Sequence, residues 1–371
     1  MSKTNSKVNN ILLHVSRVLF GLVFIFSGFV KAIDPLGVTY KLQDYFTAFA
    51  GIFYSFSDNA FAMAIALSTI ELFIGLNLVF SIQVRRTAFA ALAFMLVMTP
   101  LTLYIALKNP VSDCGCFGEA LIITNWETFW KNIVLLGLIL TVLFTTRPRQ
   151  QFFILWIEWI AMLAFVSFGI GISLYAYNHL PQIDFMPYKK GVNIAEAMKI
   201  PEGAPQDEYA TTFIYEKDGT QKEFSLENYP KDDSTWVFVD QKSTLIKEGF
   251  KPKIHDFRIF NNMDEDIVPE LLEHKGYTYL LVLYDVNKAS QEGAKQAELF
   301  YKKYENTSVR FYAVTASTDE DIALFVEKNQ LSFPFYKSDP ITLKTVVRAN
   351  PGLVLIKDGV IVGKWHWKDI Y

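Results

Sequence analysis

Hydrophobic residues along this chain of 371 residues gather in the first half, to about residue 178, and charged residues gather in the second half. A helix needs roughly 20 mainly apolar residues to cross a hydrocarbon core about 30 Å thick. Segments of that length predict five membrane spans, at residues 11–32, 60–82, 87–107, 126–144 and 152–177. The pattern therefore predicts a multi-pass membrane protein with a polar carboxy-terminal region.

Lysine and arginine residues in the short loops predict the orientation, because positively charged flanks stay on the cytoplasmic side. They precede the first span and occupy the loops between the second and third and between the fourth and fifth: Lys3, Lys7, Arg85, Arg86, Arg147 and Arg149. The alternate loops, 33–59 and 108–125, carry one lysine each, so we expect them to face outward. Five spans then leave everything after residue 177 on the outer side.

Two further segments complete the predicted membrane part. Residues 36–56 are rich in aromatic side chains and are expected to lie along the outer interface as an amphipathic helix. The fifth span has no place in a four-helix unit and is expected to return the chain to the outer side. Its Glu158, near the cytoplasmic end, is expected to reach the headgroup region.

Composition and charge agree with a membrane protein and exclude one class of partner. The chain is 51% hydrophobic and 15% aromatic, which is more apolar than a typical soluble protein. Its 35 basic and 38 acidic residues form no basic stripe that could neutralise phosphates, which argues against nucleic-acid binding. No phosphate loop or dinucleotide fingerprint is present either.

The chain's only cysteines, Cys114 and Cys116, lie together in the stretch PVSDCGCFGE, within a loop that is expected to face outward. Disulfides persist outside the cytoplasm, whereas cytoplasmic thiols are kept reduced. Gly115 permits the backbone angles that a very small disulfide ring needs, and strained, exposed disulfides are the ones that exchange. The spacing therefore favours thiol–disulfide exchange.

Two other interpretations of the cysteine pair stay open. A metal site needs three or four ligands, yet the chain has no further cysteine and its histidines are scattered singly: His14, His179, His255, His274 and His366. The pair could also be two small packed side chains or a static disulfide, since cysteine often behaves as a small hydrophobic residue. The sequence favours exchange and predicts no metal.

The string DCGCFG between the third and fourth predicted spans, with FSGFVKAIDP closing the first and IELFIGLNLVF in the second, resembles MauE of methylamine utilisation and the related DoxX-like proteins. The resemblance covers residues 10–145. It implies a four-helix unit in the bacterial inner membrane, similar to quinone-linked disulfide-forming enzymes, with Cys114 and Cys116 as the redox pair and a membrane quinone as the candidate cofactor. MauE is associated with maturation of the disulfide-rich methylamine dehydrogenase, and DoxX relatives with thiosulfate oxidation that feeds quinone.

Two ionisable residues of the spans are candidates for the same site. Lys31 closes the first span at its outer end, where an ammonium group would favour a nearby thiolate; a lysine that reaches the interface is the structural alternative. Glu71 falls near the middle of the second span, where a carboxylate normally faces the bundle interior. Glu71 could therefore relay a proton or contact a quinone. Alternatively, it has a structural role and forms a hydrogen bond with Thr99 or Thr102. About ten residues of helix at 1.5 Å each separate the depths of Lys31 and Glu71, so they are not expected to pair.

The polar region after the spans reads as an α/β unit. Asp218-Gly219 predicts a hairpin turn between two strands, and residues 234–240 predict a third strand. From residue 277 strands and helices alternate, at 277–286, 288–304, 309–316 and 318–330, and a hairpin across Asp358-Gly359 closes the chain. This order predicts a parallel sheet with an antiparallel edge.

The succession resembles thioredoxin, and residues 251–272 resemble the lead-in strand of its peroxiredoxin-like branch. Where thioredoxins carry Cys-x-x-Cys after the first core strand, this chain has residues 285–290 without a thiol, so this region cannot perform exchange by itself. Asn350-Pro351 stands where that fold carries its substrate-facing cis-proline loop. The resemblance implies that Asn350 and Pro351 bind a peptide or a partner's redox domain; a purely structural relic is the alternative.

Together these observations predict an α-helical transmembrane four-helix bundle with a fifth connecting helix, followed by a soluble α/β thioredoxin-like domain. The expected divisions are a membrane domain at 1–146, the fifth helix at 147–178, a strand-rich lead-in at 179–276 and a cysteine-free domain at 277–371. The predicted function is a thiol–disulfide oxidoreductase, with a cytoplasmic amino terminus and a periplasmic carboxy-terminal domain. Cys114 and Cys116 exchange with an extracytoplasmic thiol protein, Lys31 tunes the thiols and Glu71 handles a proton. A non-catalytic scaffold or a transporter component is the alternative.

Overall fold

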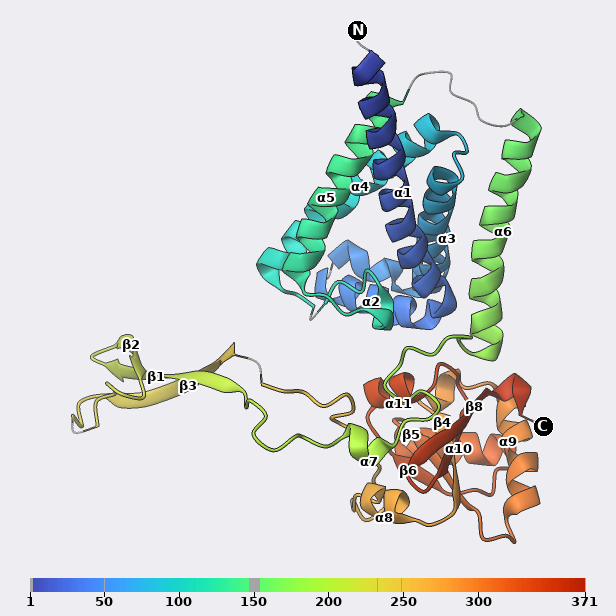
Figure 1. Cartoon of the computed structure of the whole chain (residues 1–371). Coiled ribbons are helices and arrows are strands. Elements are labelled where there is room, and N and C mark those ends of the chain that lie inside the picture. The colour runs from blue at the N-terminus through green and yellow to red at the C-terminus, as the bar shows by residue number, and fades with distance from the viewer. Residues whose placement is uncertain are drawn as a thin grey trace. The chain divides into compact units, whose positions relative to one another are not determined.

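The computed structural model describes residues 3–49, 51–111, 113–146, 154–231, 233–247 and 249–370. Within these residues five helices are long and apolar enough to cross a membrane, which confirms the predicted spans (Figure 1). They are α1 (Lys3–Ile33), α3 (Ala60–Val79), α4 (Val84–Lys108), α5 (Asn125–Thr145) and α6 (Leu155–His179). Arg147 and Arg149, the third basic cluster, lie outside the described residues, as do residues 152 and 153 of the predicted fifth span.

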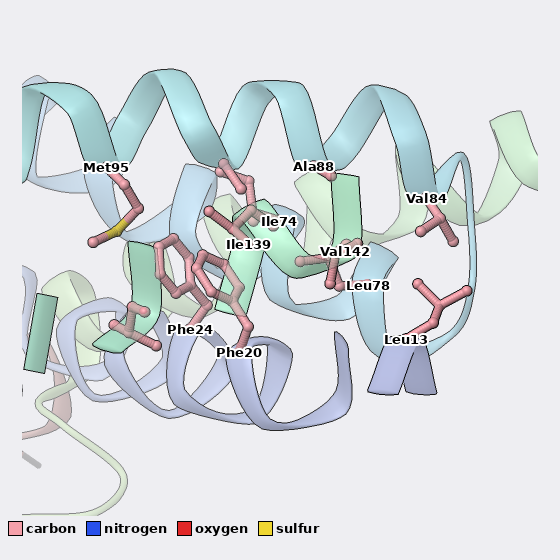
Figure 2. Close-up of a cluster of buried hydrophobic side chains, with 12 residues drawn as sticks. Leu13, Phe20, Phe24, Ile74, Leu78, Val84, Ala88, Met95, Ile139 and Val142 are labelled. Atoms are coloured by element: carbon pink, nitrogen blue, oxygen red, sulfur yellow. The ribbon is translucent and has the colours of Figure 1, made fainter. Parts of the chain in front are cut away.

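Helices α1, α3, α4 and α5 enclose one apolar core (Figure 2). Phe20 and Phe24 of α1 stack with their ring centroids 4.3 Å apart, and Phe94 of α4 meets Phe24 edge-on. Small residues let α1 and α3 approach closely: a Cβ atom added to Gly28 would lie 2.5 Å from the backbone nitrogen of Leu72. The packing of α1 against α3 therefore has a fixed register, which positions the site described below.

The described residues between α1 and α3 include two helices, in agreement with the helix predicted there. They are α2 (Pro35–Phe49) and a 3₁₀ helix, Gly51–Asn59. Pro35 begins α2, a position that suits proline because the first helical N–H has no partner within the helix.

The fifth spanning helix, α6, packs against α3, where a Cβ atom on Gly169 would come within 3.1 Å of Thr69. The prediction that Glu158 reaches the headgroups was wrong. Glu158 is buried and accepts a hydrogen bond from the Gln83 side chain. The hydrophobic pattern of α6 does not show which of its faces packs against other helices, so the burial of Glu158 could not be predicted.

Residues Val192–Phe257 form a separate compact unit. It contains α7 (Ile194–Ala197) and an antiparallel sheet in the order β2-β1-β3, made of β1 (Glu208–Lys217), β2 (Thr220–Ser225) and β3 (Val237–Lys247). Asp218 and Gly219 both have positive φ, 52° and 76°, as a two-residue hairpin turn requires. The predicted hairpin and third strand are confirmed.

Residues 258–370 hold the α/β domain, whose five-stranded sheet has the order β6-β5-β4-β7-β8. The strands are β4 (Tyr277–Leu283), β5 (Arg310–Thr315), β6 (Phe335–Lys337), β7 (Gly352–Lys357) and β8 (Val360–His366). The helices are α8 (Val268–Glu273), α9 (Gln291–Tyr304), α10 (Asp319–Asn329) and α11 (Pro340–Val346). Strands β4, β5 and β6 are parallel and β7 and β8 antiparallel, which confirms the predicted thioredoxin-like order.

The predicted lead-in strand within residues 251–272 was wrong. Phe260 makes only isolated bridges, to Asp266 and Lys337. The Asn261 side-chain oxygen accepts hydrogen bonds from the backbone nitrogens of Met263 and Glu265 and so turns the chain back on itself. Such local side-chain bonds compete with a continuous strand.

Candidate functional site

The cysteine loop, residues 109–124, joins α4 to α5 and is shaped by its own short sequence. Gly115 has a φ of +66°, in the left-handed region that favours glycine. Its N–H donates to the Asp113 side chain at 2.9 Å, which closes a tight turn around the glycine. The turn brings the sulfur atoms of Cys114 and Cys116 to 3.3 Å from each other, with both residues as free thiols.

Side chains from α1 and α2 hold this loop against the bundle. Tyr45 donates to the carbonyl of Cys114 at 2.9 Å, and Ser27 donates to the carbonyl of Cys116 at 2.7 Å. Lys41 forms an ion pair with Asp113 at 2.9 Å. As a result Cys116 is only 7% exposed, whereas Cys114 is half-buried. Cys114 is therefore the more accessible cysteine of the pair.

Lys31 and Glu71 form a buried ion pair beneath the loop. The ammonium of Lys31 donates to the two carboxylate oxygens of Glu71 at 2.6 and 2.7 Å and to Ser27 at 3.1 Å, and both charged residues are 4% exposed. The expectation that they do not pair was wrong. Because Gly28 lies against Leu72, α3 extends beyond the outer end of α1, and Glu71 is level with Ser27, whose hydroxyl contacts its carboxylate at 2.8 Å.

The predicted hydrogen bond from Glu71 to a threonine of α4 was also wrong. Thr102 donates to the carbonyl of Thr99 and accepts from the Asn132 side chain at 3.1 Å. Thr102 therefore interacts with α5 instead of α3. Which side of a long apolar helix faces which neighbour depends on bundle packing and leaves no local trace in the sequence.

The surroundings of the two thiols separate their acidities. A hydrogen bond from Cys114 stabilises the Cys116 thiolate and, although burial opposes it, the charges of Lys131 and Lys31 help to lower the pKa of Cys116 to about 6. The same hydrogen bond, together with burial, raises the pKa of Cys114. The surroundings thus favour negative charge on the inner sulfur and a proton on the outer one.

A cavity of about 230 Å³ opens beside the cysteines. Its apolar wall comes from four helices and includes Val30, Leu42, Leu67 and Leu101. Its polar lining includes both cysteines with Lys31, Asp34 and Arg348. Apolar surface and the two cysteines therefore meet in one space.

Asn350 and Pro351 lie within the carboxy-terminal α/β domain and do not line this cavity. Their peptide bond is cis, and the Asn350 side chain donates to the carbonyl of Asp285 at 2.7 Å. Pro351 is buried under α9, where a Cβ atom added to Gly293 would lie 2.9 Å from the proline ring. Of the predicted site residues, the structure brings together Cys114, Cys116, Lys31 and Glu71 and leaves these two apart.

Several polar residues of the site escaped the sequence reasoning: Ser27, Asp34, Lys41, Tyr45, Asp113, Lys131 and Arg348. Two of them had a local signal. Ser27 stands four residues before Lys31, on the same helix face, and an aspartate before Cys-Gly is typical of a side-chain-capped turn. The others reach the site only through tertiary packing.

The fold and the site define a class: a multi-pass α-helical membrane protein with a thiol pair in a loop between two of its helices and a thiol-free α/β domain after them. Residues 9–145, which include the thiol loop, match the family described as methylamine utilisation protein MauE. The match confirms the resemblance noted for the membrane helices. Residues 209–248 match a domain of unknown function, DUF8463.

One similar solved structure is a solution structure of a candidate protein disulfide isomerase from Bacteroides thetaiotaomicron. Its sequence is 15% identical to this chain, and the match covers 30% of this chain and 75% of the solved one, with a TM-score of 0.25. No curated protein matches the chain. Within the described residues, no group of three or more His, Cys, Asp or Glu side chains could hold a metal ion.

Proposed function

We propose that this chain is a membrane-embedded thiol–disulfide oxidoreductase that accepts electrons from extracytoplasmic thiol proteins through Cys114 and Cys116. The observation that carries the proposal is the asymmetry of the pair: a reachable sulfur at Cys114 next to a buried, acidic sulfur at Cys116. In the thiol–disulfide reaction the sulfur with the lower pKa is the better leaving group. The arrangement suits a disulfide that is attacked at Cys114 and releases Cys116.

In the first step, a substrate thiolate attacks the Cys114 sulfur of the oxidised pair. The Cys114–Cys116 bond breaks, a mixed disulfide forms on Cys114, and Cys116 leaves as a thiolate. A second substrate thiolate then attacks the substrate sulfur of the mixed disulfide, so that the substrate is oxidised and Cys114 takes up a proton. The pair has then accepted two electrons.

Lys31 and Glu71 have separate roles in this cycle. The Lys31 ammonium lies near enough to favour the Cys116 thiolate, and stabilising the reduced form makes a disulfide a stronger oxidant. Glu71 keeps the ammonium in place and, through Ser27, is connected to the carbonyl of Cys116. It is the group best placed to take or give the proton that accompanies reoxidation.

Reoxidation of the pair requires a two-electron acceptor, and the cavity beside it suits the head group of a membrane quinone. Its walls are mostly apolar, and it adjoins both cysteines and Lys31. A quinone bound in it would accept two electrons and two protons. Val30, Leu42 and Leu67 would hold its ring.

The proposed setting is the bacterial inner membrane, with the amino terminus in the cytoplasm and the cysteine loop and soluble domain in the periplasm. The basic residues of the loops support this orientation, because they cluster at alternate ends of the spans. The proposed divisions of the chain remain the membrane domain, the fifth helix, the strand-rich lead-in and the thioredoxin-like domain. Asn350 and Pro351 remain proposed contacts for a peptide or partner domain.

Trapping mixed disulfides in membranes of cells that express the full chain tests the function. When the thiol partner is supplied in its disulfide form, Cys116→Ser should accumulate mixed disulfides on Cys114: the Cys114 thiolate attacks the partner disulfide, one partner sulfur leaves as a thiolate, and no neighbouring sulfur remains to displace the partner. Cys114→Ser is the matched control and should accumulate none, because Cys116 is buried. Equal trapping by both variants, or by neither, would overturn the proposed chemistry, and full function of the double variant would favour a scaffold or transporter component.

A further inference from the structure

Arg348 belongs to the soluble domain but lines the thiol cavity of the membrane bundle. Its Nε contacts the two carboxylate oxygens of Asp34, at the end of α1, at 3.1 Å each. One of its terminal nitrogens donates to the Met186 sulfur at 3.3 Å, and the other is bonded to the carbonyl of Lys344. Only 7% of Arg348 is exposed, so its guanidinium is occupied by contacts within the chain.

Further contacts hold the same domain at the outer ends of the helices. Lys364 of β8 pairs with Asp184, after α6, at 2.6 Å. His179 at the end of α6 pairs with Asp369 at 2.8 Å. The ring of Tyr40, on α2, meets that of Tyr284 edge-on, with centroids 6.3 Å apart. The domain is therefore attached at several points, and of these contacts only the Asp34–Arg348 pair lies in the wall of the cavity.

An arginine is costly to bury without a matching carboxylate, so the pair of Arg348 with Asp34 favours one docked arrangement of the domain. The domain that supplies Arg348 contains no thiol, so its attachment next to Cys114 cannot serve exchange between the two parts. Arg348 stands in the wall of the cavity that Cys114 also lines, and Cys114 is half-buried there.

We propose that Arg348 is a specificity-determining residue of the thiol site, and that its pair with Asp34 is a latch that holds the cysteine-free domain at the cavity. With the latch closed, Cys114 reacts with small thiols. A folded thiol protein reaches Cys114 only after the domain has moved away. This inference deepens the proposed function, because it states which size of thiol substrate reaches Cys114. It rests on the proposed function only in assuming that Cys114 is the outer, reacting sulfur.

The test compares labelling of Cys114 by N-ethylmaleimide and by a maleimide that carries a 5-kDa polyethylene glycol chain (about 5,000 Da, far larger than the cavity). The full chain is used in membranes, in a Cys116→Ser background. Asp34→Asn and Arg348→Gln should each raise the rate with the large reagent about tenfold or more and change the rate with the small one less than about twofold. Arg310→Gln is the matched control, because its pair with Glu270 is largely exposed and neither residue lines the cavity. No change with the large reagent, or an equal rise with both, would overturn the latch.

A second measurement leaves the latch intact and so remains informative if the variants misfold. In the same background, the ratio of large-reagent to small-reagent rates at Cys114 is compared with the ratio at an exposed reference thiol. The reference is Asn262→Cys in a chain that lacks both native cysteines. A ratio about tenfold lower at Cys114 supports closure, and equal ratios contradict it. Because labelling needs no redox partner, a failed latch and a failed exchange function give different results.

Discussion

The buried pair of Lys31 and Glu71 leads to a prediction about stability that depends on geometry alone. Lys31→Met leaves the Glu71 carboxylate buried with only the Ser27 hydroxyl as a partner. Coulomb's law at an effective dielectric constant of about 20 gives an attraction of about 6 kcal/mol for the 2.6 Å contact. Removing one partner of a buried pair typically costs about 3–5 kcal/mol, because the other charge is left uncompensated. We expect a loss in this range, and a similar loss for Glu71→Gln.

The double variant separates the pair from its surroundings. Lys31→Met combined with Glu71→Gln leaves two neutral side chains, and the glutamine can still accept from Ser27. Its free energy of unfolding should therefore lie within about 2 kcal/mol of the native value, above that of either single variant.

Equilibrium unfolding of the full chain in detergent, followed by tryptophan fluorescence, measures all four proteins. Arg310→Met is the control, because its ion pair with Glu270 is largely exposed and should contribute less than about 1 kcal/mol. A double variant as unstable as the single ones, or a single variant as stable as the native chain, would refute the reasoning.

Three further outcomes are expected. The rate of Cys116 alkylation, measured by peptide mass spectrometry, should rise as the pH increases through about 6, because the thiolate forms above that pKa. Lys131→Met should move this rise to higher pH, and an unchanged pH profile would contradict the proposed effect of the Lys131 charge. Gly28→Ala should lower the free energy of unfolding by about 1–3 kcal/mol, since the added carbon would overlap α3, whereas Gly137→Ala, in open space, should not; equal effects would argue against the close packing. Tyr45→Phe should speed hydrogen exchange of the cysteine loop about fivefold through loss of one hydrogen bond, and unchanged exchange would mean that the bond does not restrain the loop.

Periodicity and turn chemistry were enough to predict the elements. Apolar runs of helical length predicted five spans, and Asp218-Gly219 and Asp358-Gly359 predicted two hairpins, because each signal lies in consecutive residues. β6 was missed because three residues, Phe335–Lys337, are too few to display a strand pattern. The false lead-in strand failed for a related reason, since the Asn261 turn overrode the local preference for extended structure.

The candidate site was predicted in its residues but not in its connections. The sequence pointed to four residues: Cys114 and Cys116 as the only cysteines in an outward loop, and Lys31 and Glu71 as ionisable residues in or at the end of a membrane span. Their mutual contacts depended on the register between α1 and α3. That register follows from how Gly28 fits against the backbone of Leu72. The prediction that Lys31 and Glu71 lie at different depths failed because it assumed that the ends of the two helices are level.

The sequence by itself determined which segments cross the membrane, which loop carries the thiols and that the soluble domain has none, because composition, spacing and the count of cysteines are properties of the chain alone. The tertiary structure decided which sulfur is exposed, which charge faces which, and that Arg348 reaches the thiol cavity from more than 200 positions away in the sequence. These features arise from contacts between side chains that are distant along the chain. Their energies depend on distance and burial, and neither is defined before the helices have packed.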